Sequence, residues 1–330
     1  MSAKISMKTL GNSEIKISSI GLGCMGLSEF YGEATSDKQG CELILHALDN
    51  GINFFDTADM YGNGHNEKLL AKGLKGRREE AVIATKFGIV REKGEYARTI
   101  SGKPEYVRKA CHDSLRRLGT DYIDLYYIHR VDGDTPIEDT IGEMSRLADE
   151  GKIRAIGISE ASAETLRKAH AVHPLSALQS EYSMLTRDPE GEILGLTREL
   201  GISFVPYSPI CRGLLSNWKP SSDNDDLRNN LPRFQGDSYT RNKSIADKLA
   251  VIATNKGCSL AQLSLAWVCA QRDNIIPIPG TTKIKNLDSN IAAASITLSA
   301  EELADIEKIL SANKVRGNRY TEEGMKGVNV

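Results

Sequence analysis

The sequence has no long apolar segment and no strong excess of charge. No stretch approaches the roughly 20 apolar residues of a membrane-spanning helix, and the start, Met1–Leu10, lacks the apolar centre of a signal peptide. The formal net charge is −2, which gives no reason to expect nucleic acid or a membrane as a partner. We therefore expect a cytoplasmic protein that acts on a small molecule, and nothing in the sequence specifies an oligomeric state.

The sequence also lacks the cysteine spacing of a metal site or a disulfide framework. Its six cysteines are scattered, with no C-x-x-C pair and no Cys/His cluster. No carboxylate cluster or H-x-x-E-H motif suggests a metal either, and no nucleophile stands beside a base. We expect no metal site and mostly buried or incidental thiols. Cys24 is the exception, because it follows a predicted strand end.

Short apolar strands alternate with amphipathic helices along most of the chain. With 40% hydrophobic and 26% charged residues, the composition is that of a soluble globular protein. A turn at Leu10–Ser13 predicts a hairpin over residues 7–17. Strands are expected at 19–23, 53–56, 81–86, 122–129, 153–158, 176–180, 202–206 and 275–278. Helices are expected at 36–50, 65–75, 104–118, 136–150, 161–172, 189–200, 241–256, 259–272, 284–293 and 300–311.

Eight strand and helix units favour a single domain over residues 1–330, built as an α/β (β/α)8 TIM barrel. A doubly wound open sheet is the competing architecture. Gly21, Gly23 and Gly26 match the bare G-x-G-x-x-G pattern, but no helix opens directly on them. The polar insertion at residues 217–237, after the seventh strand, is too long for a routine connection, and we interpret it as a lid over the site.

Three successive predicted strands end on ionisable side chains. Asp56, Lys86 and His129 stand at these ends, and Tyr61 follows Asp56 in a turn rich in Gly and Asn. Side chains at the C-terminal ends of barrel strands face the ligand, so these four are expected to converge. Each also has a plain structural alternative, namely a helix cap, a contact with a helix C-terminus or a hydrogen bond to the backbone.

Together these side chains predict a general acid that donates a proton to a carbonyl oxygen. A phenol has an ordinary pKa near about 10 and donates a proton poorly at neutral pH unless a cation favours its phenolate. Lys86 is expected to have this effect on Tyr61, and Asp56 to keep the ammonium charged and oriented. His129 is expected to donate a hydrogen bond to the substrate oxygen.

Reduction of a carbonyl also requires a hydride, which no side chain provides, so a nicotinamide cofactor is implied. The segment from Ile278 to Lys283 leaves a strand and enters a helix near Ile284, and backbone N–H groups at a helix start favour phosphate. Lys283 adds a charge suited to an adenosine 2′-phosphate. The alternative is an ordinary loop with a solvated lysine.

At this point the sequence resembles the aldo-keto reductase superfamily, from Ile20 to about Leu310. The branch that contains plant perakine reductase, with similar plant, fungal and bacterial proteins, is the most alike. The matching motifs are Phe55-Asp56-Thr57-Ala58 with Tyr61-Gly62, Thr85-Lys86, Ile128-His129, Gln179 with Glu181-Tyr182-Ser183, Tyr207-Ser208-Pro209, and Pro277 to Lys283 with Asn286 and Asn290.

The resemblance implies a barrel that binds NADPH in an extended form. Tyr61 would be the general acid, Lys86 and Asp56 its tuning pair, and His129 the residue that orients the carbonyl. Tyr207 would stack on the nicotinamide. The remaining cofactor contacts would come from Ser159 and Gln179 at the carboxamide, Ser208, Ile210 and Gly213 along the pyrophosphate, and Thr282, Lys283, Asn286 and Asn290 at the adenosine end. Pro209, Gly280 and Thr281 would also contact the cofactor.

The sequence departs from the family pattern at two positions. Glu160 stands where many members have Asn, which affects one carboxamide contact, and Asn286 stands where an arginine is common. The substrate side is expected to be lined by Cys24, Met25, Tyr31, Phe87, Arg130 and Trp218. Most of these side chains suit an apolar or aromatic aldehyde, whereas Arg130 would bind an anionic substituent or pair with Asp132 or Asp134.

Three functions are compatible with the sequence. The first is NADPH-dependent reduction of aldehydes and some ketones. The second is an NADPH-binding, redox-sensing regulatory subunit similar to potassium-channel β-subunits, disfavoured by the short start before Leu10 and the lack of an obvious apolar docking surface. The third is a lyase or isomerase with Lys86 as a Schiff base, disfavoured because Asp56 would keep that amine charged.

Overall fold

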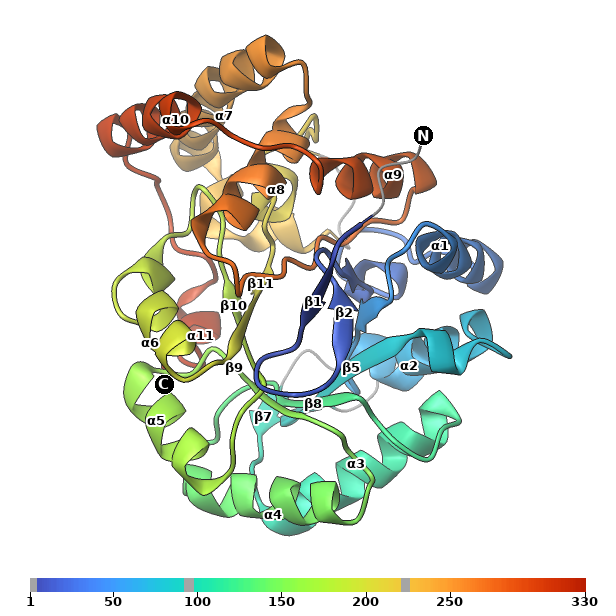
Figure 1. The fold of residues 1–330 in the computed structure, drawn as a ribbon. Coiled ribbons are helices and arrows are strands. Elements are labelled where there is room, and N and C mark those ends of the chain that lie inside the picture. The colour runs from blue at the N-terminus through green and yellow to red at the C-terminus, as the bar shows by residue number, and fades with distance from the viewer. Residues whose placement is uncertain (1–4, 92–97, 221–225) are drawn as a thin grey trace.

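A nearly closed barrel of seven parallel strands forms the centre of the molecule (Figure 1). The computed structural model describes residues 5–91, 98–220 and 226–330. Across the barrel the strand order is β3, β4, β5, β8, β9, β10, β11. Their bounds are Leu22–Gly23, Phe54–Asp56, Val82–Phe87, Leu125–Ile128, Ile156–Ser159, Ala177–Glu181 and Ser203–Tyr207. The predicted α/β barrel is therefore confirmed.

The eighth position of the barrel is filled by an irregular segment, residues 275–280. Ile276 and Ile278 donate backbone N–H groups to β11, at 2.9 and 3.1 Å. On the other side the carbonyl of Pro277 accepts from Gly21, before β3, at 2.9 Å. The prediction of a regular strand at 275–278 was wrong, because Pro277 and Pro279 have no N–H to donate to a ladder. The segment still joins the two edges of the sheet.

Helices surround the barrel, and several begin or end where the sequence provides a cap. The capping box of Ser36 and Gln39 starts α1, and Gly119 ends α3 in the left-handed conformation. Helices α7 and α10 pack against each other at the periphery. The helix bounds are α1 Asp37–Asp49, α2 His65–Gly73, α3 Pro104–Leu118, α4 Ile137–Asp149, α5 Ala163–Val172, α6 Ile193–Glu199, α7 Gly236–Lys256, α8 Leu260–Gln271, α9 Ile284–Ala293, α10 Ala300–Ala312 and α11 Glu322–Met325.

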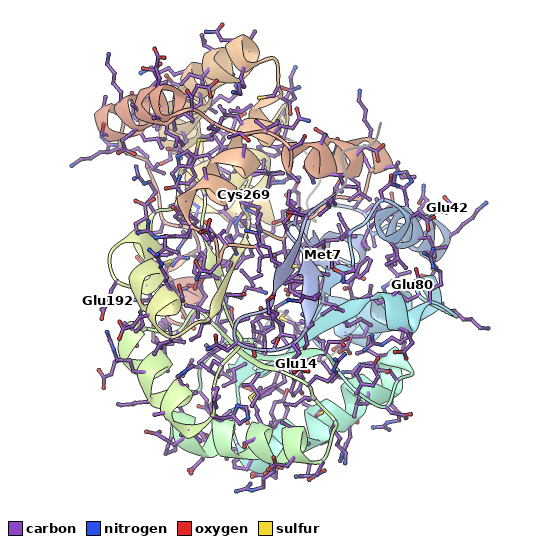
Figure 2. All side chains as sticks on the ribbon, viewed as in Figure 1. Met7, Glu14, Glu42, Glu80, Glu192 and Cys269 are labelled. Carbon is purple, nitrogen blue, oxygen red and sulfur yellow. The ribbon has the colours of Figure 1, made fainter. Side chains whose placement is uncertain are left out.

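The predicted hairpin closes one end of the barrel. Strands β1 (Met7–Thr9) and β2 (Lys16–Ser18) pair antiparallel, and apolar residues of the hairpin pack against Phe54 and Tyr127 inside the barrel. The hairpin lies in front of the ring of strands in Figure 1, and Figure 2 shows Glu42, Glu80 and Glu192 pointing outward from the periphery. A ligand must therefore enter from the opposite end, where the strands finish.

Several short elements escaped sequence analysis. A second hairpin, β6 (Ile89–Arg91) and β7 (Arg98–Ile100), follows β5. Within the predicted insertion at 217–237, residues 221–225 lie outside the described part. The remainder includes 3-10 turns at Leu227–Asn230 and Pro232–Phe234, and its last two residues begin α7. In the described ranges, none of the helices has the length and apolar character needed to cross a bilayer.

Candidate active site

A cavity of about 890 Å³ opens at the C-terminal ends of the strands. Its wall contains residues that lie in or follow β3, β4, β8, β9, β10 and β11, together with residues of α9 and part of the C-terminal tail. A volume of this size lies within the range of small-molecule and cofactor sites.

Lys86 lies fully buried at the centre of the candidate catalytic group. Its Nζ donates to Asp56 Oδ1 at 2.5 Å, to the Thr57 carbonyl at 2.8 Å and to the Tyr61 hydroxyl at 3.2 Å. Neighbouring parallel strands supply the geometry, because Asp56 pairs with Ala84 in the register, two residues before Lys86 and on the same face. All three N–H donors of Lys86 are engaged, which leaves no exposed amine for a Schiff base.

Gln179 completes the surroundings of Asp56 from across the barrel. Its Nε2 donates to Asp56 Oδ2 at 2.7 Å, so both oxygens of this buried carboxylate have a donor. Sequence analysis placed Gln179 at the cofactor carboxamide and missed this contact, because nothing local relates residues 123 positions apart. Gln179 also lines the cavity.

A left-handed turn presents Tyr61 to the cavity. Gly62, Asn63 and Gly64 have φ values of 53°, 54° and 87°, a region in which Gly and Asn are the least strained residues. The Tyr61 ring meets the His129 ring edge-on, with 5.8 Å between centroids and an interplanar angle of 87°. Both side chains line the cavity, and each residue is 7% exposed.

Burial dominates the electrostatics of the group. It raises the pKa of the Tyr61 phenol well above its ordinary value, and the Asp56 carboxylate adds to the increase. The hydrogen bond from Lys86 to the Tyr61 hydroxyl is present, and the effect of the ammonium on the phenol stays a prediction. Burial also raises the pKa of Asp56 and lowers that of Lys86, while the contacts between the two oppose both shifts. Tyr61 therefore keeps its proton at neutral pH.

All residues expected to contact a cofactor line this cavity. They are Ser159, Gln179, Tyr207, Ser208, Pro209, Ile210, Gly213, Gly280, Thr281, Thr282, Lys283, Asn286 and Asn290. No side chain caps the start of α9, so the first N–H groups of that helix are available for a phosphate. Lys283 precedes that start and is exposed. This wall suits an extended dinucleotide.

The backbone that follows β11 is strained where it lines the cavity. Ser208, Cys211 and Arg212 have φ values of 51°, 49° and 54°, and Gly213 follows at 96°. Non-glycine residues in the left-handed region carry a cost and cluster at functional sites. Sequence analysis identified Ser208 and Gly213 but not this conformation, because only Gly213 carries a local signal for it.

The predicted substrate side divides into residues that line the cavity and residues that do not. Met25, Tyr31, Arg130 and Trp218 line it. Cys24 and Phe87 do not line it. Both residues are completely buried, with 0% of their surface exposed, and belong to the hydrophobic core. The expectation for these two is corrected. Successive side chains of a strand point to opposite faces, so Phe87 turns outward where Lys86 turns inward.

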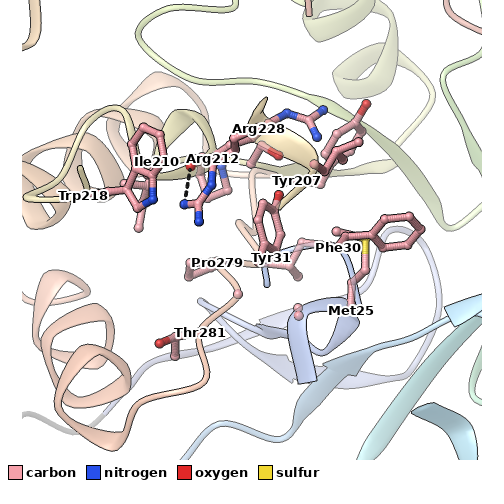
Figure 3. Close-up of a pocket in the computed structure, with 18 of the residues that line it drawn as sticks. Met25, Phe30, Tyr31, Tyr207, Ile210, Arg212, Trp218, Arg228, Pro279 and Thr281 are labelled. Atoms are coloured by element: carbon pink, nitrogen blue, oxygen red, sulfur yellow. Dashed lines mark hydrogen bonds between the residues drawn. The ribbon is translucent and has the colours of Figure 1, made fainter. Parts of the chain in front are cut away.

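The described residues of the predicted lid, 217–220 and 226–237, include ones that contact the loop after β3. The backbones of Asp226 and Tyr31 form an isolated antiparallel β-bridge. The Asp226 side chain forms an ion pair with Arg228. The Arg228 guanidinium lies 4.3 Å from the centroid of the Trp218 ring and 5.1 Å from that of Tyr31. Figure 3 shows the side chains of Arg228, Trp218 and Tyr31, with the hydrogen bond from Arg228 to the Arg212 carbonyl dashed. The described part of the predicted lid thus covers the site.

The C-terminal tail, residues 313–330, forms a wall that sequence analysis missed. Tyr320, Thr321 and Gly324 line the cavity, and the Tyr320 hydroxyl lies 2.8 Å from that of Tyr207. No periodic pattern or strand end marked this tail.

Glu160 belongs to the same region of the structure. It is buried, and its carboxylate accepts from Arg319 at 3.2 Å and from the Glu181 backbone at 2.9 Å. Its φ of 56° is again left-handed. Glu160 is absent from the cavity wall, so its departure from the family pattern serves the attachment of the tail.

Comparisons with known proteins agree with this geometry. Residues 19–311 match the aldo/keto reductase family. Probable aldo-keto reductase 1 of Glycine max is 47% identical over 322 residues, covering 96% of this chain and 92% of that protein. The glycerol dehydrogenase of Gluconobacter oxydans aligns with a TM-score of 0.86 at 30% identity, over 93% of this chain and 95% of that one. An aldo-keto reductase of Bacillus halodurans in its holo form aligns with a TM-score of 0.79 at 32% identity, over 95% of this chain and 98% of that one. The chain therefore belongs to the aldo/keto reductase family, whose members generally reduce carbonyl groups with nicotinamide cofactors.

Proposed function

We propose that the protein is an NADPH-dependent carbonyl reductase that converts aldehydes and some ketones to alcohols. The observation that carries this proposal is the connected group at the cavity wall, in which Lys86 bonds to both Asp56 and the Tyr61 hydroxyl. We further propose that it acts as a single domain in the cytoplasm, on a small-molecule carbonyl compound, without a nucleic acid or membrane partner.

Each side chain of the group has a distinct role in this proposal. Tyr61 transfers its phenolic proton to the carbonyl oxygen as that oxygen gains negative charge. The hydrogen bond from Lys86 stabilises the phenolate that remains, and Asp56 with Gln179 holds the ammonium in place. His129, whose ring adjoins that of Tyr61, orients the carbonyl.

In the same proposal, residues of the cavity wall hold the parts of NADPH. Tyr207 packs against the nicotinamide ring, and Ser159 holds the carboxamide. The strained turn from Ser208 to Gly213 follows the pyrophosphate, and the open start of α9 with Lys283 receives the adenosine 2′-phosphate. When bound, the reduced nicotinamide supplies the hydride.

Turnover with uncharged aldehydes tests the proposal directly. The purified protein is expected to oxidise NADPH at 340 nm with benzaldehyde or hexanal and to form one alcohol for each NADPH consumed. Tight binding of NADPH, measured by fluorescence, without reduction of any carbonyl in a broad panel would contradict it. That result would favour a regulatory NADPH-binding subunit.

Lys283→Met is expected to weaken NADPH binding by about 10-fold, because a charge-assisted contact with phosphate contributes roughly 1.5 kcal/mol or more. NADH affinity should change little, since NADH has no 2′-phosphate. Fluorescence titration with both cofactors measures the two effects. Lys308→Met, which removes an exposed lysine of α10, is the matched control and should resemble the wild type. An equal loss of affinity for both cofactors would exclude a specific role at the 2′-phosphate.

A further inference from the structure

Arg130 differs from the other arginines of the cavity wall in its electrostatic environment. Arg212 pairs with Glu181 at 2.8 Å, and Arg228 pairs with Asp226 at 2.5 Å. Within the described ranges, no carboxylate lies within 4.0 Å of the Arg130 guanidinium. Glu160 acts on its charge only through space and is itself paired with Arg319. The guanidinium therefore has no contacting counter-charge, and Arg130 lies with His129 and Tyr61 in the wall of the same cavity.

Of the two acids nearest to Arg130 in the sequence, Asp132 is committed to other contacts, and Asp134 is exposed. Asp132 accepts from the backbone of Gly102 at 2.8 Å, from the backbone of Asp134 at 2.9 Å and from the Thr135 hydroxyl at 2.7 Å. This decides between the two alternatives that the sequence left open for Arg130. An ion pair with Asp132 or Asp134 does not form, and the anionic-substituent alternative remains.

The Arg130 side chain is held in a fixed position. Its Nη1 donates to the His129 carbonyl at 2.7 Å and to the Ser159 hydroxyl at 3.3 Å. The C-terminal tail covers its aliphatic stem, since a Cβ added at Gly327 would lie 3.2 Å from Arg130 Cδ. A guanidinium anchored on one edge and on its stem is preorganised to bind a ligand with its remaining N–H groups.

We propose that Arg130 binds a carboxylate of the substrate, so that the preferred substrates are carbonyl compounds that carry a carboxylate. This rests on the proposed reductase function and specifies its substrate class. A half-buried cation without a contacting carboxylate is costly, and an anionic ligand that contacts it offsets that cost. The planar fork of a guanidinium matches the two oxygens of a carboxylate. Apolar neighbours such as Met25 and Trp218 then contact the rest of the substrate.

Matched pairs of substrates test the proposal. The 2-, 3- and 4-formylbenzoates each have a neutral methyl ester, so the ratio of kcat/KM for acid and ester isolates the carboxylate. With saturating NADPH, at least one acid is expected to exceed its ester by about 10- to 100-fold in the wild type. Arg130→Met should reduce this ratio to near one. Arg130→Lys, which keeps the charge without the fork, should retain an intermediate ratio.

A control variant separates the proposed contact from a general change in charge. Arg198 is exposed and lies beside Thr9 and Gly11 of the hairpin, at the other end of the barrel. Arg198→Met removes the same charge and should leave the ratio at its wild-type value. The proposal is overturned if no acid is preferred by the wild type, or if Arg130→Met keeps the preference. It is equally overturned if Arg130→Met weakens NADPH binding while the ratio stays unchanged, which would make Arg130 a cofactor contact.

Failure of the proposed function is distinguishable from failure of this inference. If neither acids nor esters are reduced, the reductase proposal fails, and binding of benzoate to the NADPH complex still tests Arg130. Calorimetry should then show benzoate binding at least 10-fold tighter than benzamide in the wild type and no such difference in Arg130→Met. Equal affinities in the wild type would overturn the carboxylate site independently of turnover.

Discussion

Replacing Tyr61 with phenylalanine is expected to lower kcat for aldehyde reduction by about 10²- to 10⁴-fold, the usual contribution of a positioned general acid. Phenylalanine preserves the ring that packs edge-on against His129 and removes only the hydroxyl that receives the hydrogen bond from Lys86. Binding of NADPH should therefore remain close to that of the wild type. Steady-state rates at 340 nm and a fluorescence titration measure the two quantities separately.

Tyr122→Phe is the matched control, because that hydroxyl bonds to Glu79 on the outside of the protein. Its rate should equal that of the wild type. If Tyr61→Phe kept more than a tenth of the wild-type kcat, another group would have to donate the proton. A parallel loss of NADPH binding would instead show that the hydroxyl holds the cofactor.

The pKa of Tyr61 predicts how the rate of aldehyde reduction by the wild type depends on pH. Burial raises the pKa of Tyr61 above its ordinary value, so the protonated acid persists to higher pH than in a free phenol. Reduction is therefore expected to hold its rate through neutral pH and to decline only above about pH 10, the ordinary phenol pKa. A decline already near neutral pH in kcat would indicate that Lys86 outweighs burial once the cofactor is bound.

The convergence of Asp56, Lys86 and His129 was predictable because it follows from local patterns and one rule of architecture. A short apolar run predicts each of these three strands, and each run ends at an ionisable side chain. Parallel strands bring their C-terminal ends to one edge, so the three side chains had to meet. The structure adds the distances, and with them the engagement of all three Lys86 donors.

The parts that the sequence did not reveal depend on contacts between distant residues. The bond from Gln179 to Asp56 crosses the barrel, and the approach of Tyr320 to Tyr207 spans 113 positions. Neither leaves a periodic signal in either segment. The outward position of Phe87 is different, because strand alternation after Lys86 already determines it. The prediction that Phe87 lines the site did not take this alternation into account.

The irregular eighth segment shows how a local rule and the overall fold can conflict. Residues 275–278 are apolar and sit at the position where the barrel requires a strand, yet Pro277 cannot donate to a ladder. The structure resolves the conflict with alternate hydrogen bonds from Ile276 and Ile278. Fold class is therefore predictable from the repeat of strand and helix, whereas the regularity of one strand depends on its proline content.

Lys86→Met is expected to abolish both activity and much of the stability. The variant leaves Asp56 buried with only Gln179 as donor among its described side-chain contacts. Breaking a buried ion pair from one side costs about 3–5 kcal/mol, and kcat should fall by about 10²- to 10⁴-fold because Tyr61 loses its hydrogen-bond donor. Chemical denaturation and the 340 nm assay measure these effects on the same samples.

The pH dependence of that destabilisation identifies its cause. In the variant, burial raises the pKa of Asp56 without an opposing ammonium. The stability linked to this carboxyl group is fully present below its pKa in the unfolded chain, about 4. It is lost as the pH rises through the higher pKa of the folded state. The deficit relative to the wild type should therefore be largest at neutral pH and shrink in acid.

A double variant then separates charge burial from catalysis. Asp56→Asn combined with Lys86→Met removes both charges, so most of the lost stability should return while activity stays low. Lys109→Met, which breaks an exposed pair with Asp113, should change neither stability nor activity measurably. If the deficit of Lys86→Met were constant with pH and the double variant were no more stable, the loss would come from packing around the methionine. An unpaired Asp56 carboxylate would then not be its cause.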